Sequence, residues 1–368
     1  MTLIKEIDIQ QLSNWLKTGK DITILDIRPL SERNEWYIPS SIYVDAYNNL
    51  KAGNSEALND LQIDIQKPVV TLCAGGNLSR FAAKILAKKG FESYSLQGGM
   101  KAWNYAFDTA VMEFQNFKII QIRRLAKGCL SYMIGSKNSA MVIDASLDPQ
   151  IYDHIAKKEA WKIEFVTDTH IHADYVSRTK ELAIFTKATH LMNSLADVAY
   201  PFDALSNNEN IKIGDIKIKA IHTPGHTWES TTFAIGKHIL LTGDTLFTDA
   251  IGRPDLKANE EEAKNKTIAL YKSLQFIKTF DDETLIFPAH ISKPIEFGQA
   301  IITETLGKIK VTIPVLSFTI EHFLERILSK LPPSPHNYLT IAEINRTGNL
   351  ADFIIADLEA GANRCAIN

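Results

Sequence analysis

The chain has few cysteines and no long apolar stretch. Its cysteines, Cys73, Cys129 and Cys365, are an odd and scattered set in 368 residues. Such a set argues against a disulfide framework and leaves room for a reactive thiol. No uninterrupted apolar run approaches the roughly 20 residues of a membrane-spanning helix, and the first residues lack the apolar segment of a signal peptide. We therefore expect a cytoplasmic protein with no membrane partner.

An excess of one charge is also missing. The 40 Lys and Arg residues against 43 Asp and Glu residues give a formal net charge of -3. Nucleic-acid binding needs a basic surface, so we expect no nucleic-acid partner. An apolar content of 45% and a mean hydropathy of -0.09 are typical of globular proteins. The length exceeds that of one average domain, which predicts two domains, each with its own core.

The first hundred residues alternate short apolar runs with a helical pattern. Strands are predicted at Ile24-Leu25, at Val69 to Leu72 and at Tyr94 to Leu96. The segment Ser79 to Lys89, closed by Gly90, predicts a helix. This alternation is typical of a small parallel sheet flanked by helices, an α/β domain that we expect to span residues 1–108.

A second domain is expected over residues 113–368. Its first part holds consecutive strand-like runs with only turns between them, at Phe117 to Arg123, Leu130 to Ile134 and Met141 to Ile143. Such runs predict an antiparallel opening rather than a continuation of the parallel sheet. We place the junction of the two domains between Asp108 and Glu113.

In the second domain, His and Asp residues follow short apolar runs. Residues 169–175 read Thr-His-Ile-His-Ala-Asp-Tyr, and His226, Asp244 and His290 follow further strand-like runs. Strand ends collect along one edge of a sheet, so these side chains should converge. They offer more nitrogen and carboxylate ligands than a structural zinc site needs. The pattern therefore predicts a catalytic metal with open positions.

These segments, in order and spacing, resemble the metallo-β-lactamase fold, and its persulfide dioxygenase branch most closely. The resemblance rests on the 169–175 segment and on Thr-Pro-Gly-His-Thr (223–227), Thr-Gly-Asp-Thr-Leu-Phe (242–247), Gly-Arg-Pro-Asp (252–255) and Phe-Pro-Ala-His (287–290). It implies an αββα sandwich, an α+β fold, and one Fe(2+) ion held by His170, His226 and Asp244. Such a two-His, one-carboxylate face leaves positions open for a persulfide sulfur and O2.

Position 175 departs from the family pattern. Hydrolases of this fold, such as the glyoxalase II type, use two metal ions, and the second needs Asp174, a histidine at position 175 and His290. This chain carries Tyr175, and a phenol with a pKa near ~10 is a poor replacement for imidazole at neutral pH. We therefore expect His172, Asp174, Tyr175 and His290 to lie near the metal or to form a weak or vestigial second site, which favours oxidation over hydrolysis.

The first domain carries a thiol at the start of a glycine-rich loop. The segment Cys73-Ala-Gly-Gly-Asn-Leu-Ser-Arg80 follows a predicted strand and precedes a predicted helix. Backbone N–H groups and the helix dipole would stabilise a thiolate or a persulfide there. With Leu-Asp-Ile-Arg (25–28) and Leu-Gln-Gly-Gly-Met-Lys-Ala-Trp (96–103), this loop resembles a rhodanese. The resemblance implies a persulfide on Cys73, and because Ala74 is not basic, Arg80 is the nearest loop cation.

Five other residues carry weaker expectations or none. Arg253 is a candidate for binding a substrate carboxylate, although bracing the loop after Asp244 is the stronger expectation. Cys129, in Gly-Cys-Leu-Ser-Tyr, is expected to be a small buried apolar residue of a strand. Cys365 receives no role. Asp26 is expected to form a structural pair with Arg28.

The two resemblances together imply an enzyme with two reactions on sulfane sulfur, one in each domain. A low-molecular-weight thiol persulfide, such as glutathione persulfide, would be oxidised by O2 to sulfite, and Cys73 would exchange sulfur with thiosulfate or sulfite. Linking the two domains raises the local concentration of the shared intermediate. Two alternatives stay open: a zinc-dependent thioester hydrolase with an attached sulfurtransferase domain, and a non-enzymatic persulfide sensor with a structural metal. The sequence is also compatible with a homo-oligomer.

Overall fold

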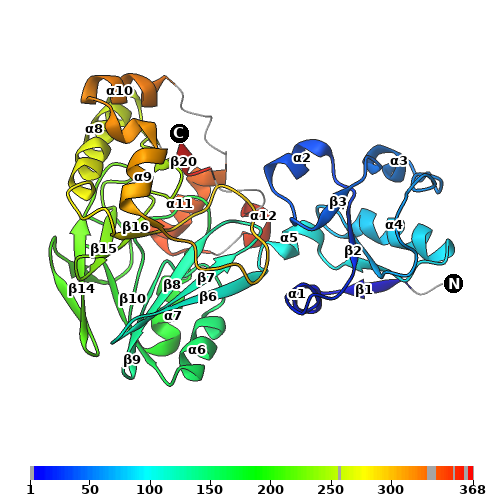
Figure 1. Cartoon of the computed structure of the whole chain (residues 1–368), viewed down its shortest axis with the longest axis horizontal. Helices are drawn as coiled ribbons and strands as arrows, with labels where there is room; N and C mark the ends of the chain where they lie inside the picture. The colour runs from blue at the N-terminus through cyan, green and yellow to red at the C-terminus, as the bar shows by residue number, and fades with distance from the viewer. Residues whose placement is uncertain (1–3, 256–257, 330–336, 351–352, 360–363, 368) are drawn as a thin grey trace.

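The computed structural model describes residues 4–255, 258–329, 337–350, 353–359 and 364–367. Figure 1 shows the amino-terminal strands, in blue and cyan, beside a larger body that holds the rest of the chain. Within the described ranges, no helix is both long enough and apolar enough to cross a membrane.

The amino-terminal part is a five-stranded sheet in the order β1-β5-β4-β2-β3, and all its strand pairs are parallel. Its strands are β1 (Lys5–Ile7), β2 (Thr23–Asp26), β3 (Ser41–Tyr43), β4 (Val69–Leu72) and β5 (Ser93–Leu96). Its helices are α1 (Ile9–Lys17), α2 (Leu30–Glu35), α3 (Tyr47–Lys51), α4 (Asn77–Lys88) and α5 (Gly99–Trp103). The small parallel α/β unit predicted from the sequence is confirmed.

Two large sheets form most of the described part of the larger body. The seven-stranded sheet has the order β12-β11-β10-β9-β8-β7-β6 and comprises β6 (Phe107–Glu113), β7 (Lys118–Arg124), β8 (Leu130–Ser136), β9 (Ser139–Ile143), β10 (Lys162–Thr167), β11 (Thr189–Asn193) and β12 (Asp203–Leu205). The six-stranded sheet has the order β13-β14-β15-β16-β18-β19 and comprises β13 (Asn210–Ile213), β14 (Ile216–His222), β15 (Thr231–Ile235), β16 (Ile239–Gly243), β18 (Leu285–Pro288) and β19 (Glu304–Thr305).

Three apolar clusters define four layers. One cluster joins the facing sides of the two sheets and includes Tyr132, Phe233 and Phe287. A second lies between the six-stranded sheet and α8 (Glu260–Ile277), α9 (Leu306–Thr312) and α10 (Ile320–Leu328). A third lies between the seven-stranded sheet and α6 (Pro149–Lys158) and α7 (Thr179–Thr186). The two helical layers lie on opposite sides of the sheets in Figure 1, so the predicted αββα sandwich is confirmed.

The expected junction at residues 108–113 differs from the structure. These residues lie inside β6, which pairs along its whole length with β7. The burial of alternate residues, Asp108 and Ala110, is what a strand with one face on the sandwich requires. Residues 107–113 therefore belong to the second sheet, and the chain leaves the first unit directly after α5.

The carboxy-terminal segments return to the strand ends of the sandwich. Strand β20 (Ala366–Ile367) pairs with β17 (Ile251–Gly252). On α11 (Asn337–Thr347), the Asn345 side chain donates to the carbonyls of His172 and Tyr175 and accepts from the Ser177 N–H. This helix therefore fixes the loop that carries His170, His172 and Asp174.

Polar contacts hold the amino-terminal unit against the sandwich. The Trp36 indole donates to the Leu125 carbonyl at 2.7 Å, and Arg364 pairs with Glu35 at 2.8 Å. The Asn104 amide donates to the Glu359 carbonyl at 2.8 Å, just after α12 (Ile355–Leu358). The indole contact is buried, so part of this interface is closed to water.

A buried ion pair joins four segments at this interface. The Arg124 guanidinium, fully buried, donates to the Glu359 carboxylate at 2.7 Å and to the Asn104 carbonyl at 3.0 Å. The other Glu359 carboxylate oxygen accepts from the Val176 N–H. Burial alone would lower the pKa of Arg124, but Glu359 holds that pKa above its ordinary value. The arginine therefore stays charged.

We predict that Glu359→Gln destabilises the protein by about 3 to 5 kcal/mol, because it leaves a buried charge without its partner. The matched control is Asp153→Asn, which breaks the exposed Lys157–Asp153 pair on α6 and should change stability by no more than about 0.5 kcal/mol. Denaturant unfolding of both variants measures the difference. Equal effects would contradict the role of the buried pair.

Candidate metal centre and persulfide loop

The predicted ligands all follow strand ends of the sandwich. The segment with His170, His172 and Asp174 follows β10, and His226 lies in the loop after β14. Asp244 comes directly after β16, and His290 lies two residues beyond β18. Because β16 and β18 are parallel neighbours, their ends bring Asp244 and His290 together.

The first cluster consists of His170, His226 and Asp244. Their side chains are at most 2% exposed. Asp244 Oδ2 lies 3.7 Å from His170 Nε2 and 3.5 Å from His226 Nε2, and one donor atom from each residue lies within 4.8 Å of the others. The imidazole planes are nearly perpendicular, at 88°. The three donors therefore converge on one point from different directions.

The donor atoms of this cluster fit a metal ion. His170 Nε2 and Asp244 Oδ2 have no hydrogen-bond partner among the residues that the structure describes. A buried polar atom without a partner is unfavourable unless a cation or a proton satisfies it. The other ring nitrogens are occupied: His226 Nδ1 donates to the Arg253 carbonyl at 2.7 Å, and His170 Nδ1 hydrogen-bonds with the Thr169 hydroxyl. Such contacts leave Nε2 of each ring for a metal.

The protonation states of the cluster suit metal binding. Burial and the neighbouring His172 lower the pKa of His170 well below its ordinary value, so this imidazole is neutral. Burial would raise the pKa of Asp244, but the charge and hydrogen bond of His290 lower it. A neutral imidazole and an ionised carboxylate are the forms that ligate metals.

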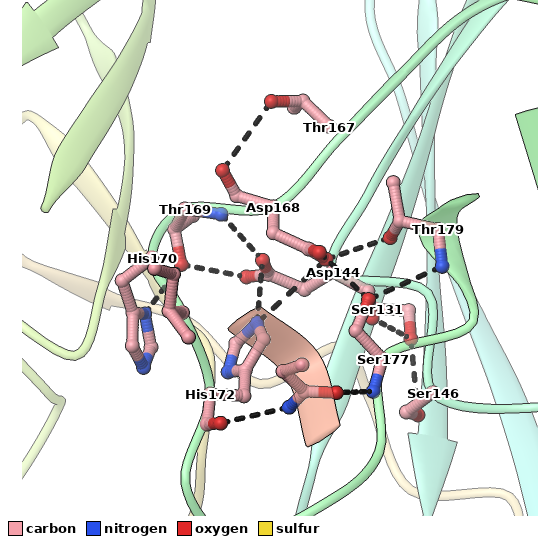
Figure 2. Close-up of polar contacts among 12 residues, drawn as sticks. Ser131, Asp144, Ser146, Thr167, Asp168, Thr169, His170, His172, Ser177 and Thr179 are labelled. Atoms are coloured by element: carbon pink, nitrogen blue, oxygen red, sulfur yellow. Dashed lines mark hydrogen bonds and ion pairs between the residues drawn. The ribbon is translucent and has the colours of Figure 1, made fainter. Parts of the chain in front are cut away.

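Figure 2 shows the network behind the first cluster. His172 Nε2 donates to Asp144 Oδ1 at 3.0 Å, and Asp144 also accepts from the N–H and hydroxyl of Thr169. His172 Nδ1 has no partner in the described ranges, and its ring lies 4.1 Å from that of His170. We expected His172 near the metal or at a vestigial second site, and its ring lies beside the first cluster; its role there stays a prediction.

A second cluster contains Asp174, His290 and Cys129. Asp174 Oδ2 lies 3.0 Å from His290 Nε2 and 3.5 Å from the Cys129 sulfur. Burial and Asp174 raise the pKa of Cys129 to about 11. We expected Cys129 to be a small buried apolar residue of a strand. It is buried, but it lies one residue before β8, and its thiol faces a carboxylate.

Two contacts connect this second cluster to its surroundings. His290 Nδ1 donates to Asp244 Oδ1 at 2.6 Å, which joins the two clusters. Cys365, to which we assigned no role, offers its sulfur within 4.8 Å of donor atoms of Asp244 and His290. A place near the ligands could not be predicted from the sequence for Cys129 or Cys365, because both lie in segments far from the motifs.

Tyr175 occupies the position where the family pattern has a histidine. Its hydroxyl donates to the Asp144 carbonyl at 3.4 Å, and its ring stacks on His172 at 4.3 Å. Burial, followed by the carboxylates of Asp144 and Asp168, raises the pKa of Tyr175 well above its ordinary value. The phenol is therefore neutral and is engaged by the backbone.

Arg253 lies where it supports the loop after Asp244. Its guanidinium is fully buried and donates twice to the Asp255 carboxylate, at 2.7 Å each. Its backbone carbonyl accepts a hydrogen bond from His226 Nδ1. Arg253 thus contacts a metal-ligand candidate through its backbone, and a substrate contact of its side chain stays a prediction.

The Cys73 loop forms a cradle for sulfur. The Cys73 sulfur accepts from the N–H groups of Gly76 at 3.2 Å and Ser79 at 3.4 Å, and the Ser79 hydroxyl lies 3.5 Å away. Gly76 has a φ of +90°, which suits glycine. A Cβ on Gly99 would lie 2.2 Å from the Cys73 carbonyl, so only glycine allows this close approach. Backbone donors around a thiol stabilise negative charge on sulfur.

Arg80 and Ser79 differ in their relation to this cradle. The Arg80 side chain pairs with Glu6 of β1 at 3.4 Å and is half-exposed. Ser79, which the sequence analysis did not single out, is fully buried and also hydrogen-bonds with Ser95 at 2.9 Å. The backbone and Ser79 form the contacts to sulfur, and a role for Arg80 as loop cation stays a prediction. The structural pair of Asp26 and Arg28 is present, at 2.7 Å.

Comparison with protein families gives two matches along the chain. Residues 8–106 match the rhodanese-like domain, and residues 125–290 match the metallo-beta-lactamase superfamily. The crystal structure of a metallo-beta-lactamase from Staphylococcus aureus subsp. aureus COL is similar, with 30% identity and a TM-score of 0.59, over 65% of this chain and 75% of that one.

Two kinds of enzyme are similar in sequence to the sandwich. Persulfide dioxygenase ETHE1, mitochondrial, of Mus musculus is 26% identical over 215 residues, which is 57% of this chain and 80% of that protein. Hydroxyacylglutathione hydrolase of Francisella philomiragia is 28% identical over 161 residues, or 43% of this chain. The chain spans 61% of the length of that hydrolase.

We predict that Asp244→Ala lowers metal affinity at least ~100-fold, because it removes both a ligand and its negative charge. Loss of a residue that only supports a ligand already lowers metal affinity about 10- to 100-fold in such sites. Elemental analysis after dialysis measures retained metal. Asp249→Ala, at an exposed carboxylate of the same loop, is the control and should retain metal. Undiminished metal in Asp244→Ala would contradict the first cluster.

Proposed function

Because the chain belongs to the metallo-β-lactamase superfamily and carries a rhodanese-like domain ahead of that fold, we propose that it is a persulfide dioxygenase with its own sulfurtransferase. The substrate class is a low-molecular-weight thiol persulfide, such as glutathione persulfide. The oxidant is O2, and the metal is one Fe(2+) per chain.

The proposed oxidation balances as RSSH + O2 + H2O → RSH + SO3(2-) + 2 H+. The sulfur–sulfur bond breaks, the terminal sulfur is oxidised, and O2 is reduced. Ferrous iron would supply joint binding of persulfide and O2, the chemistry for which two-His, one-carboxylate faces are known. His170, His226 and Asp244 would hold the ion. Arg253 and Thr169 would keep the imidazoles oriented through the contacts described above.

The observation that carries this proposal is the presence in one chain of a three-donor metal cluster and a sulfur cradle. Thiolate attack by Cys73 on the outer sulfur of thiosulfate would form a persulfide on Cys73 and release sulfite, and the reverse reaction would consume sulfite. The N–H groups of Gly76 and Ser79 already point at the sulfur that would carry the charge. Sulfite and persulfide are thus shared by both reactions.

The contact between the two units supports a functional connection between their sites. A cavity of about 300 Å³ lies where they touch. Ala74, the neighbour of Cys73, lines it together with Met100, Lys101 and Trp36 of the first unit and Ala126 of the second. A small thiol could exchange between the units through this space.

A zinc-dependent thioester hydrolase is the second candidate. It is supported by the similarity to hydroxyacylglutathione hydrolases and by Asp174 and His290, which lie beside the first cluster. It is opposed by Tyr175, whose hydroxyl is engaged by the Asp144 carbonyl.

We also propose a cytoplasmic location, because all three cysteines are free and buried.

We predict that the iron-loaded protein consumes O2 when a thiol persulfide is added and releases sulfite in a one-to-one ratio. An oxygen electrode and sulfite analysis measure this, with Asp244→Ala as the inactive control. Thioester hydrolysis by the zinc-loaded protein without O2 uptake by the iron-loaded form would establish the hydrolase instead. Binding of persulfide without turnover in either form would point to a sensor.

We predict that Cys73→Ser abolishes sulfur transfer from thiosulfate and leaves persulfide-dependent O2 uptake within about twofold of the wild type, because serine cannot carry sulfane sulfur. Intact-mass measurement should show a gain of one sulfur atom on the wild type after donor treatment and none on the variant. A persistent mass gain would contradict Cys73 as the carrier. A collapse of O2 uptake would show that persulfide must pass through Cys73 first.

A further inference from the structure

Cys129 lies among metal-type donors that the proposed function does not use. Cys129 is 1% exposed and lies one residue before β8, where its backbone forms an isolated bridge with His290. One donor atom each from Cys129, Asp174 and His290 lies within 4.8 Å of the others. This second cluster contains a thiol, a carboxylate and an imidazole, and all three side chains are buried.

Unpartnered atoms independently indicate a ligand at this place. Asp174 Oδ1 has no hydrogen-bond partner in the described part of the chain, and neither has His290 Nε2, although the latter lies 3.0 Å from Asp174 Oδ2. Both residues are at most 1% exposed. Water does not reach them from outside, so a buried cation would remove the penalty that both atoms carry.

The orientation of His290 favours the same interpretation. Its Nδ1 donates to Asp244 Oδ1 at 2.6 Å, which leaves Nε2 for the side of Asp174 and Cys129. A carboxylate that holds one imidazole nitrogen fixes the ring and raises the ligand strength of the other nitrogen. Asp244 would thereby position a ligand of the second cluster while it binds the ion of the first.

We propose that Cys129, Asp174 and His290 form a second metal site whose sulfur ligand takes the place of the histidine missing at position 175. Tyr175 does not compete for this ion, because its hydroxyl donates to the Asp144 carbonyl. From the sequence, the second site was expected to be weak or vestigial because the family motif contains no other ligand for it. The thiol reaches the cluster from another strand.

The donor set selects the class of ion. Thiolate ligands favour thiophilic ions such as zinc, whereas the two-His, one-carboxylate first cluster suits ferrous iron. On binding, the Cys129 sulfur would lose its proton to solvent. The thiolate and Asp174 would then supply two negative charges to a divalent cation. The proposal depends only on the second cluster and holds for either reaction of the first.

The rival arrangement is a proton in place of the ion. A protonated His290 between Asp174 and Asp244 would also satisfy the carboxylates, and both carboxylates raise the pKa of His290 above its ordinary value despite burial. This arrangement needs no thiol ligand. A measurement of zinc uptake and of its ligands therefore separates the two.

The test uses the full-length chain, purified without oxygen, loaded with one equivalent of iron and then titrated with zinc. Iron and zinc are counted in the same sample, so displacement of iron is visible. We expect one zinc ion in addition to iron, and X-ray absorption at the zinc edge should show one sulfur at ~2.3 Å. Cys129→Ala should lower zinc affinity at least tenfold and remove the sulfur signal, with iron retained.

Two matched variants control for folding and for the other buried thiol. The double variant Cys129→Ala with Tyr175→His should regain the second ion without a sulfur ligand, because it restores the histidine of the family pattern. Cys365→Ala should keep both the zinc and the sulfur signal. Retained iron in each variant shows that the first cluster is intact.

Two results would overturn the proposal. One is a wild-type chain that takes up no zinc beyond the iron of the first cluster, as the protonated arrangement requires. The other is a sulfur signal that survives in Cys129→Ala and disappears in Cys365→Ala. Neither result depends on O2 uptake, so failure of this site is distinguishable from failure of the proposed dioxygenase.

Discussion

The Asp244 carboxylate is the interaction on which both clusters depend. One of its oxygens faces the Nε2 atoms of His170 and His226, and the other accepts from His290. The parallel pairing of β16 with β18 places Asp244 beside His290 and thus provides this double contact. A change in the register of that pair would separate the clusters, because side chains alternate between the faces of a sheet.

A second layer of contacts keeps the ligand loop rigid. Asp144 binds His172 and the Thr169 backbone, Asn345 binds two carbonyls of the loop, and Glu359 binds the Val176 N–H. These groups come from a strand end and from two carboxy-terminal segments. Such outer contacts fix the tautomer and direction of metal ligands. The carboxy-terminal region thus acts as part of the metal centre although it carries no motif.

Under the proposed function, the two units stabilise reactive sulfur in different ways. In the first unit, backbone N–H groups around Cys73 stabilise charge without a metal. In the second, buried imidazoles and carboxylates are arranged for a cation. The contacts of Trp36 and Arg364 across the interface hold the units together. The two sites therefore have a fixed relation rather than that of tethered domains.

Features that depend on local order could be predicted from the sequence. Apolar runs indicated the strands, polar residues at their ends indicated the first cluster, and the loop at Cys73 indicated the sulfur cradle, because each of these patterns lies within a few neighbouring residues. The place of β6 in the second sheet became clear from the fold, since strand pairing depends on a partner. The fold also decided where single side chains point: Arg80 toward Glu6 and the Tyr175 hydroxyl toward Asp144. The position of Cys129 beside Asp174 and His290 results from three distant segments that meet at one sheet edge, and no spacing along the chain records such a meeting.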